Sequence, residues 1–392
     1  MTSKRDGAPR EDHNRKGPIR VTIYSFEPKE RACAHVRLFG PLECLSDEVE
    51  IQEGVLHEKS GVRIDVDVLD HSDIVVIQRD FPSRKTMGSI GRIFSSGKPV
   101  VYDIDDLLLD LPAGHVSRKI MEKNRTSMIE VLSRADAVTV STEELREALS
   151  PYGDAIHVLP NLIDERIWDR RIPPSGPGPV VVGFSGTISH GNDLALIEEA
   201  VIEISERHGD RVAFRFMGCT RERIASLPGY SYIQFEPAYR SYARALQASG
   251  IEIGLVPLED NPFNRCKSNI KWLEYAACGI VGVYPDLPPY NRCVRSGKTG
   301  LVVGNRKEDW VEGIEFLIRD MNARKLMKDE ACDEALSRYS LASGAARYLE
   351  TYRNVMREAS MGRRWNSKEA LFSGMWPNVC RSLDRLRRRL GK

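Results

Sequence analysis

The segment Ile251–Tyr284 reads IEIGLVPLED NPFNRCKSNI KWLEYAACGI VGVY. It begins with an apolar run, continues through a polar loop into an amphipathic stretch, and ends in a second apolar run. This order is typical of a strand–helix–strand unit in a parallel sheet. We therefore expect strands at Ile251–Val256 and Ile280–Tyr284, with a helix at Ser268–Ala277 between them.

The same alternation of apolar run, loop and amphipathic helix continues on both sides of this unit. In the second half of the chain it predicts further strands at Val180–Ser185, Val212–Met217, Tyr232–Phe235 and Gly300–Val303. It predicts helices there at Leu194–Arg207, Ser241–Gln247 and Lys307–Arg319, followed by a wholly helical stretch at Ala323–Glu358. In the first half it predicts strands at Arg20–Ser25, Ile74–Gln78, Pro99–Asp103, Ala137–Val140 and Ala155–Leu159, and helices at Arg118–Arg134 and Thr142–Leu149. The stretch Val49–Val68 is ambiguous between these patterns.

A proline- and glycine-rich segment, Pro173–Pro179, divides the two halves, because PPSGPGP can form neither a helix nor a central strand. We expect a disordered leader at 1–18, an N-terminal Rossmann-like domain at 19–172, a linker at 173–179, a C-terminal Rossmann-like domain at 180–350 and a helical basic tail at 351–392. Two such doubly wound α/β domains would place their ligands at the carboxyl ends of the strands, in a cleft between the domains.

The composition excludes several classes of protein. The 392 residues carry a formal net charge of +1, which argues against a nucleic-acid partner. No run reaches the ~18–20 apolar residues of a membrane-spanning helix, and the charged N-terminus is unlike a secretory signal. The eight cysteines include no C-x-x-C pair, so they suggest neither a zinc site nor a disulfide framework. We expect a cytoplasmic protein.

The loop and helix of the opening unit carry the strongest chemical signal. At ~100° per residue, Lys267, Lys271 and Glu274 project from one side of the predicted helix. Two ammonium groups at a helix N-terminus, with Ser268 as its N-cap, form an anion site that fits a diphosphate. A carboxylate further along the helix can accept both hydroxyls of a ribose. The pattern predicts a nucleoside diphosphate along this helix, with an ordinary solvated helix face as the alternative.

This segment, Asn261–Gly279, resembles the donor-binding region of the bacterial glycosyltransferases of family 4, the group 1 enzymes. The resemblance continues through Leu287–Tyr290 and Gly297–Asn305, which is similar to the family's ending G-x-x-G-L-L-V, and it covers residues 180–320. It implies a GT-B fold and a metal-independent transfer of sugar from a nucleotide sugar, without a cofactor and with retention of the anomeric configuration.

Carried over by residue, the resemblance places Glu274 at the second glutamate of the family's E-x7-E pattern, where it would hold the donor ribose. The first glutamate is replaced by Cys266 here. A contact to the donor sugar is therefore missing, and Lys267 is our candidate to take over part of its role. Cys266 is also a candidate reactive thiol, because nearby lysines lower a thiol pKa, although a buried inert cysteine is the commoner case.

A glycine-rich loop, GFSGTISHGNDL at Gly183–Leu194, lies between a predicted strand and helix. Its glycines let the backbone approach a ligand closely, and its amides can cradle phosphate. We take Gly186, Thr187 and His190 as donor-binding candidates, with a generic turn as the alternative. The loop matches neither G-x-G-x-x-G nor the Walker pattern.

The acidic segment KPVVYDIDDL at Lys98–Leu107 allows three functional interpretations. It contains a D-x-D metal motif at Asp103 and Asp105, and it faintly resembles the D-x-D-G-T of haloacid-dehalogenase phosphatases. The third interpretation, which we favour, aligns Asp105 and Asp106 with a His-Asp pair that faces the transferred sugar in family 4. They would then be catalytic, accepting or orienting the acceptor hydroxyl proton, whereas carboxylates that merely cap the next helix are the structural alternative.

Two arginines give weaker signals. Arg79 ends a strand at the cleft edge. Arg37 could bind an anionic acceptor or a donor phosphate, or it could form a surface salt bridge. Asn161, in a segment resembling the family's P-N-G-V-D, could touch the donor or form a turn. With Asp103, these are our acceptor-side or cleft candidates.

The tail ends in a leucine stripe set among arginines, at Leu383, Leu386 and Leu390. A basic amphipathic helix suits an anionic membrane surface, although a helix packed on the first domain is an equal alternative.

We expect a glycosyltransferase that uses a nucleotide-sugar donor and a glycan or lipid-linked acceptor of the cell envelope. The alternatives are a nucleotide-sugar epimerase, a metal-dependent transferase or phosphatase using Asp103 and Asp105, and a non-catalytic nucleotide-sugar-binding scaffold.

Overall fold

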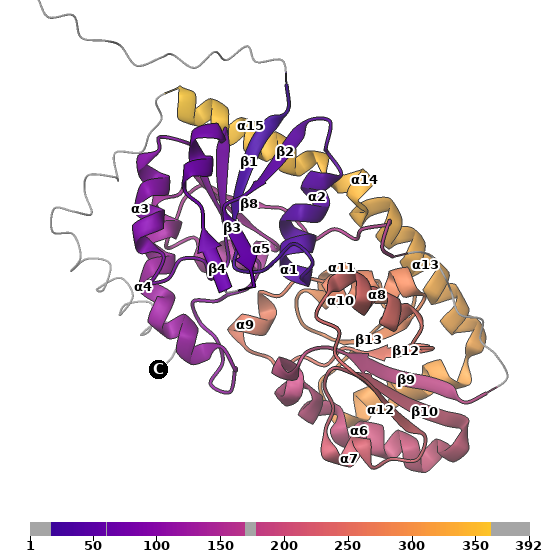
Figure 1. The fold of residues 1–392 in the computed structure, drawn as a ribbon. Coiled ribbons are helices and arrows are strands. Elements are labelled where there is room, and N and C mark those ends of the chain that lie inside the picture. The colour runs from indigo at the N-terminus through magenta and orange to yellow at the C-terminus, as the bar shows by residue number, and fades with distance from the viewer. Residues whose placement is uncertain (1–16, 60, 169–177, 362–392) are drawn as a thin grey trace, which may run out of the picture.

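The computed structural model describes residues 17–59, 61–168 and 178–361, which form two α/β domains (Figure 1). Each domain contains a six-stranded sheet in which all neighbouring strands pair in parallel. The prediction of two doubly wound domains is therefore confirmed. The leader up to residue 16, the linker up to residue 177 and the arginine-rich tail from residue 362 lie outside the described residues.

The N-terminal sheet follows the pattern of β-branched runs in the sequence. Its strands lie in the order β2 (Val49–Glu53), β1 (Ile19–Tyr24), β5 (Ile74–Gln78), β6 (Val100–Asp103), β7 (Ala137–Val140) and β8 (Ile156–Val158). The ambiguous stretch after the first helical segment contains β2, an antiparallel hairpin of β3 (Val55–Glu58) and β4 (Gly61–Ile64), and a 3-10 turn, η2 (Asp67–His71). The alternation failed there because the hairpin is a side branch that does not join the parallel sheet.

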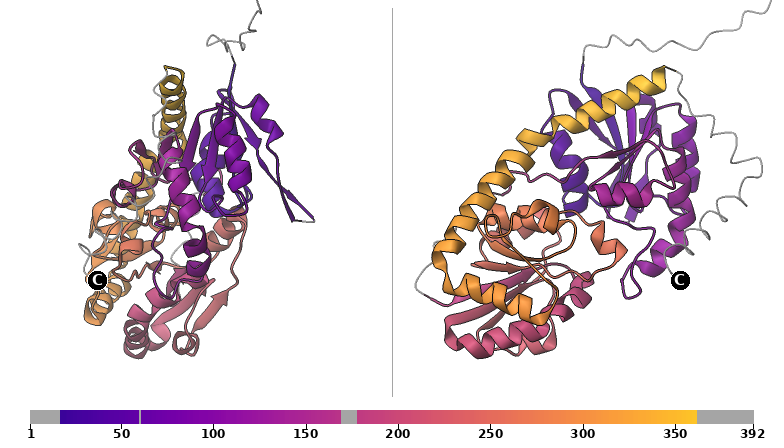
Figure 2. Two further views of the ribbon diagram at one scale, coloured as in Figure 1. Left: turned by 90° about the vertical axis from the view of Figure 1, so that its left-hand side faces the viewer. Right: turned by 180° about the vertical axis from the view of Figure 1, so that it is seen from behind.

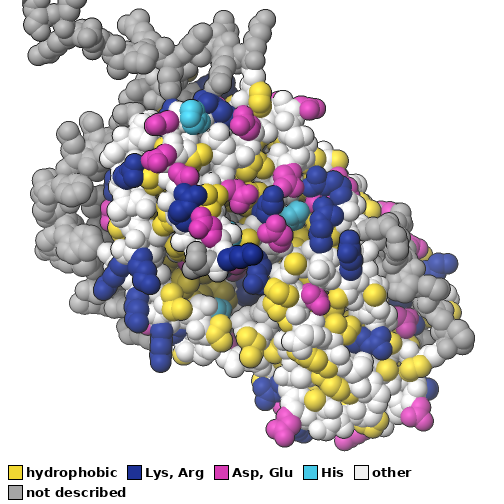
Figure 3. Space-filling view, viewed as in Figure 1, with side chains coloured by type: hydrophobic (Ala, Val, Ile, Leu, Met, Phe, Trp, Pro, Cys, Tyr) yellow, Lys and Arg dark blue, Asp and Glu magenta, His cyan; other side chains and the backbone are white. Residues whose placement is uncertain are grey.

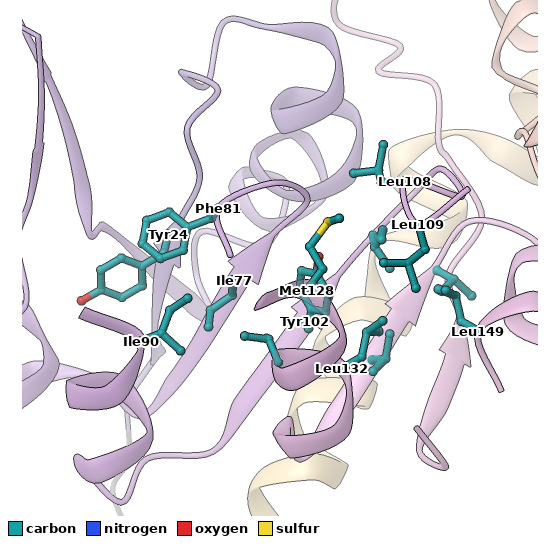
Figure 4. Packing of buried hydrophobic residues seen from close by; sticks show 14 of the residues in the cluster. Tyr24, Ile77, Phe81, Ile90, Tyr102, Leu108, Leu109, Met128, Leu132 and Leu149 are labelled. Atoms are coloured by element: carbon teal, nitrogen blue, oxygen red, sulfur yellow. The ribbon is translucent and has the colours of Figure 1, made fainter. Parts of the chain in front are cut away.

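Helices cover both faces of the N-terminal sheet. One face packs against α3 (Met87–Ser95), α4 (Arg118–Arg134) and α5 (Glu143–Leu149), and Figure 4 shows the resulting core around Ile77, Tyr102 and Met128. The other face packs against a continuous helical segment made of α1 (Ala32–Ala34), a π-helical turn η1 (His35–Phe39) and α2 (Gly40–Glu43), and against the last described helix, α15 (Ala346–Ser360).

The C-terminal sheet has the strand order β11 (Tyr230–Ile233), β10 (Val212–Met217), β9 (Val180–Ser185), β12 (Ile253–Leu255), β13 (Val281–Pro285) and β14 (Leu301–Val303). One face is covered by α6 (Gly191–His208) and α12 (Lys307–Arg319), and the other by α8 (Tyr239–Gln247), α10 (Ile270–Cys278) and α13 (Met321–Tyr339). Short elements complete the domain: η3 (Ile188–His190), η4 (Gly209–Arg211), α7 (Glu222–Ala225), α9 (Pro262–Arg265) and α11 (Tyr290–Cys293).

Several predicted boundaries differ from the structure by one to three residues, and two of these differences have clear local reasons. The strand predicted at Tyr232–Phe235 is β11, which starts two residues earlier because the chain turns at Gly229 with a φ of 70° and pairs with β10 at once. The helix predicted from Ser268 begins at Ile270, and Asn269 occupies the N-cap position. The hydroxyl of Ser268 accepts a hydrogen bond from another residue, Asn161, at 2.8 Å.

A run of helices joins the two domains. After α13, which packs on the C-terminal domain, the chain continues through α14 (Leu341–Gly344) into α15 on the back of the N-terminal domain (Figure 2). The short helix α9 also reaches from the C-terminal domain to the N-terminal one, whose core includes Phe263 and Cys266. Conversely, Val36 of η1 packs in a core cluster of the C-terminal domain, so side chains from each domain are buried in the other.

The strand orders of the two sheets indicate where a ligand-binding cleft should lie. In the C-terminal sheet the order reverses between β9 and β12, and in the N-terminal sheet between β1 and β5. Ligands of doubly wound sheets bind outside the carboxyl ends of the strands at such points.

None of the helices in the described part of the chain combines the length and the apolar composition that a bilayer crossing requires.

Candidate functional site

A cavity of about 270 Å³ lies between the domains, and Figure 3 shows the surface hollowed at their junction. It brings together side chains predicted separately from distant parts of the sequence. The predicted residues that line it are Asp105, Asp106, Asn161, Gly186, Thr187, His190, Lys267, Ser268, Lys271 and Glu274. The three predicted residues that do not line it are Arg37, Arg79 and Asp103.

Lys271 lies on the first turn of α10, where its ammonium donates to the backbone carbonyl of Ser185 at the end of β9. It also stands 5.2 Å from the centre of the Phe184 ring. Burial lowers the pKa of Lys271 to about 8, so the side chain is mostly charged at neutral pH. The helix N-terminus and this ammonium together make the floor of the cavity positive.

Glu274 lies one turn further along α10 and is 5% exposed. Its Oε2 accepts a hydrogen bond of 2.8 Å from the hydroxyl of Tyr242, which in turn accepts from Ser185 Oγ at 3.0 Å. Burial raises the pKa of Glu274, and nearby Lys271 opposes that shift. The carboxylate is therefore held in a fixed orientation at the cavity wall, as recognition of a hydroxyl pair requires.

Lys267 precedes α10 and has a different environment. Its ammonium stands 4.6 Å above the Phe263 ring, and within the described residues it forms no ion pair with a carboxylate. It is close enough to Asp106 to lower the pKa of that side chain. An ammonium without a fixed carboxylate partner at a cavity wall is suited to bind an anion.

Cys266 faces away from the cavity and is packed in the core of the N-terminal domain. Burial raises the pKa of Cys266 to about 12, and the nearby carboxylates of Glu144 and Asp106 raise it further, so the structure does not support the hypothesis of a reactive thiol. Its carbonyl oxygen accepts a hydrogen bond of 2.9 Å from Thr142, the N-cap of α5. At the position of the family's first glutamate this chain therefore makes a contact between domains.

The glycine-rich loop lies across the cavity from α10. A Cβ on Gly186 would stand 2.6 Å from the Phe184 ring, so this close approach of the backbone requires glycine. His190 Nδ1 and Asp193 Oδ2 form a hydrogen bond of 2.8 Å. Burial, with a contribution from Lys271, lowers the pKa of His190 to about 4, so the ring is neutral at pH 7. It can act as a hydrogen-bond partner but does not supply positive charge.

The three aspartates at the end of β6 and just after it form ion pairs with two arginines. Asp103 and Arg37 are both fully buried and form an ion pair of 2.7 Å, to which Thr139 adds a hydrogen bond of 2.7 Å. Our hypothesis that Arg37 meets an anionic ligand is therefore wrong, because its guanidinium is enclosed behind the cleft. Arg79, which has a positive φ of 48°, pairs with both Asp105 and Asp106.

These pairings do not favour the metal or phosphatase interpretation, because cationic side chains already occupy the carboxylates of Asp103 and Asp105. The two neighbouring aspartates also differ. Burial raises the pKa of Asp105, whereas Lys267 and Arg79 outweigh burial and lower the pKa of Asp106. Asp106 is thus ionised at the cavity wall.

Asn161 connects this buried layer with the segment that precedes α10. Its Oδ1 accepts from Arg37 Nη1 at 3.0 Å, and its Nδ2 donates to Ser268 Oγ at 2.8 Å. The hydrogen bond to Ser268 crosses from one domain to the other. Asn161 therefore helps to hold the two domains together at the cleft.

Known proteins resemble this chain in sequence or in fold. No protein-family model matches the chain. Among curated proteins, it is 23% identical over 245 residues to TuaH of Bacillus subtilis (strain 168), which carries the provisional name of a teichuronic acid biosynthesis glycosyltransferase. That match covers 56% of this chain and 58% of TuaH, less than two thirds of either.

Solved structures match over a larger part of the chain. Sucrose-phosphate synthase of Thermosynechococcus elongatus has a TM-score of 0.64 at 13% identity, over 86% of this chain and 99% of that one. HepE of Anabaena, in complex with UDP and glucose, has a TM-score of 0.60 at 13% identity, over 86% and 100%. The chain has the GT-B fold.

Sequence reasoning missed three side chains of this GT-B cleft. Tyr242 holds Glu274, Asp193 holds His190, and His115 lies beside Lys267 and Asp106, which both affect its pKa. The spacing of Asp193 three residues after His190 was a readable signal. His115 lies in a long loop, and nothing in the sequence brings that loop to the cleft.

Proposed function

We propose that this chain is a glycosyltransferase that moves a sugar from a nucleoside diphosphate sugar to a hydroxyl of a glycan or other cell-envelope acceptor. The observation that carries the proposal is the cavity at the N-terminus of α10, where Lys267, Lys271 and Glu274 are within reach of one ligand. Glycosyltransferase names among the compared proteins support the same activity, and TuaH suggests the envelope context.

The proposed chemistry is electrostatic. As the glycosidic bond to the diphosphate breaks, negative charge develops on the leaving oxygen. Two ammonium groups, the helix N-terminus and the amides around Gly186 are fixed where they can stabilise that charge. This arrangement supplies the stabilisation that a divalent cation gives in other transferases, so we expect no metal requirement.

On the opposite wall, the ionised Asp106 is our candidate for the group that orients the acceptor hydroxyl or accepts its proton. Asp105, whose pKa is raised by burial, positions Arg79 behind it. The arrangement is compatible with retention of the anomeric configuration, which we propose from the resemblance to family 4. Glu274 is our candidate for the donor ribose.

Two finer points also belong to the proposal. HepE binds UDP in its solved complexes, so we take uridine diphosphate as the first nucleotide to test. The basic tail, together with a lipid-linked acceptor, would place the enzyme at the inner face of a membrane, and we expect a cytoplasmic location.

The test is thermal unfolding with UDP, GDP, ADP and CDP, each with and without EDTA. A ligand at about 100 times its dissociation constant adds ~2.7 kcal/mol, a rise of several degrees. We expect a rise with UDP that EDTA leaves unchanged. A rise abolished by EDTA would instead indicate a metal site, and no rise with any nucleotide would contradict the proposal.

Turnover separates the transferase from its alternatives. Incubation with UDP-glucose or UDP-N-acetylglucosamine should release UDP, slowly by hydrolysis without an acceptor. An altered nucleotide sugar without UDP release would identify an epimerase, and binding without any conversion would identify a scaffold.

A further inference from the structure

A second, smaller pocket adjoins the nucleotide cavity, and Lys267 lines both. Its walls come from the two domains. The N-terminal domain supplies the loop around His115, and the C-terminal domain supplies the start of α6 and the segment after β12. The other lining residues are Pro112, Gly114, Val116, Ile188, Ser189, Gly191, Asn192, Asp193, Glu259, Asn261, Phe263 and Asn264.

The hydrogen-bonding groups of this pocket are mostly uncharged. Burial and the nearby Lys267 lower the pKa of His115, so the ring is neutral at pH 7. Its Nδ1 accepts a hydrogen bond of 3.1 Å from the Ser117 backbone N–H. The ring proton is therefore on Nε2, which has no protein acceptor among the described residues and is free to donate to a ligand.

Asn192 provides a second such group on the facing wall. Its amide is exposed and has no hydrogen-bond partner in the described part of the chain. A Cβ on Gly114 would stand 3.0 Å from the Asn192 amide nitrogen, so the absence of a side chain there lets the two domains approach at this point. The pocket thus presents an imidazole N–H and a free amide from opposite sides.

The charge of the pocket argues against a second phosphate site. The carboxylates of Asp193 and Glu259 belong to its lining. Asp193 is already bound to His190 and to the Asn264 amide at 3.2 Å, and Glu259 accepts from Asn261 at 3.2 Å. Because these carboxylates repel the negative charge of a phosphate, a neutral ligand that carries hydroxyl groups fits the pocket better than a phosphate does.

The size and position of the pocket further limit the kind of ligand that it can bind. The pocket encloses about 70 Å³, room for one edge of a sugar ring rather than for a nucleotide. Its rim carries the exposed side chains Val116 and Ile188, one from each domain, which can contact the apolar face of a sugar. Its inner end is Lys267, where the proposed diphosphate lies.

We propose that this pocket is the subsite for the acceptor's sugar ring, with His115 and Asn192 as its hydrogen-bonding side chains. The assignment rests on the proposed function, because it takes the nucleotide cavity as the donor site. An acceptor held here would present a hydroxyl next to Asp106 and Lys267, whose charges both reach His115.

The experiment uses saturation-transfer difference NMR on the full chain with saturating UDP and methyl glycosides of glucose, galactose, mannose and N-acetylglucosamine. We expect at least one glycoside to receive saturation. His115→Ala and Asn192→Ala should each weaken its binding about tenfold, the effect of losing one hydrogen bond, and leave the UDP signal unchanged. The surface variant His71→Ala is the matched control and should change neither signal.

Three results would overturn the subsite: no glycoside bound in the presence of UDP, glycoside binding unchanged in both variants, or a parallel loss of UDP. A fourth arm uses the nucleotide sugars themselves. If the variants weaken contacts to the sugar of UDP-glucose but not to free glycosides, the pocket holds the transferred sugar instead of the acceptor. Failure of UDP to bind the unaltered protein would be a failure of the proposed function, and it is seen separately.

Discussion

The substitution of Cys266 for an expected glutamate is the residue-scale feature that sets this chain apart. The cysteine contributes an apolar contact between domains, and the next residue, Lys267, lines both pockets. A lysine cannot accept hydrogen bonds from sugar hydroxyls as a glutamate does. It can bind a phosphate oxygen, so the change in chemistry moves this position towards recognition of the diphosphate.

Lys267→Ala should therefore weaken UDP binding about tenfold or more, because a charge-assisted hydrogen bond is lost. Isothermal titration calorimetry measures the affinity directly. The fold should stay intact, since within the described residues the ammonium pairs with no carboxylate and only contacts the Phe263 ring. Lys325→Ala, an exposed change on α13, is the control. Equal affinities in both variants would remove Lys267 from the donor site.

Lys271 predicts a pH dependence of donor binding. Burial places its pKa at about 8 in the free protein, and a bound diphosphate raises that value by favouring the charged form. UDP affinity should hold steady near pH 7 and then fall as pH rises above 8, by up to about tenfold per pH unit until the pKa of the complex is reached. Lys271→Arg keeps the charge and should abolish the fall. A flat profile in the unaltered protein would contradict the assignment.

At the scale of elements, the strands and long helices follow directly from local sequence. The runs that form β5, β7, β9 and β10 are continuous, apolar and bounded by turn residues, and their predicted limits are those observed. The amphipathic helices α4 and α12 also match. In these elements the local pattern and the buried environment agree, which is why they could be predicted.

The contacts between elements could not be predicted in the same way. Arg37 looked like a cleft residue because it follows β1, but the π-helical turn η1 directs it into the interior against Asp103. Phe263 looked like part of a loop, but α9 buries it in the other domain. Both placements depend on packing between distant segments, which periodicity does not encode.

The buried pair of Arg37 and Asp103 gives an element-scale prediction. Asp103→Asn leaves a fully buried guanidinium without a counter-charge, so we expect a loss of about 3–5 kcal/mol in the free energy of unfolding. Urea titration measures it. Asp67→Asn removes an exposed pair with Arg92 and should cost at most about 1 kcal/mol. Similar losses in the two variants would mean that the buried pair has no special structural role.

At the scale of the whole molecule, the proposed site exists only when the two domains are together. Asp106 and Asn161 come from one domain, and Lys267, Lys271 and Glu274 come from the other. The two domains are held together by the hydrogen bonds Asn161–Ser268 and Thr142–Cys266 and by the packing of α9. Donor affinity and domain closure should therefore be thermodynamically linked.

Phe263→Ala tests this linkage, because it removes the largest apolar side chain of α9 from the core of the N-terminal domain. Without that anchor the cleft should open more often, so the radius of gyration from small-angle scattering should increase in the free protein and return towards its original value with saturating UDP. UDP affinity should fall because part of the binding energy is spent on closure. Phe316→Ala, which truncates a side chain that is 44% exposed on α12, should leave both quantities unchanged. If Phe263→Ala lowers UDP affinity while the radius of gyration stays constant, the effect is local, through the Phe263 contact with Lys267. If neither quantity changes, α9 does not couple the domains, and closure depends on the contacts of Asn161 and Thr142 alone.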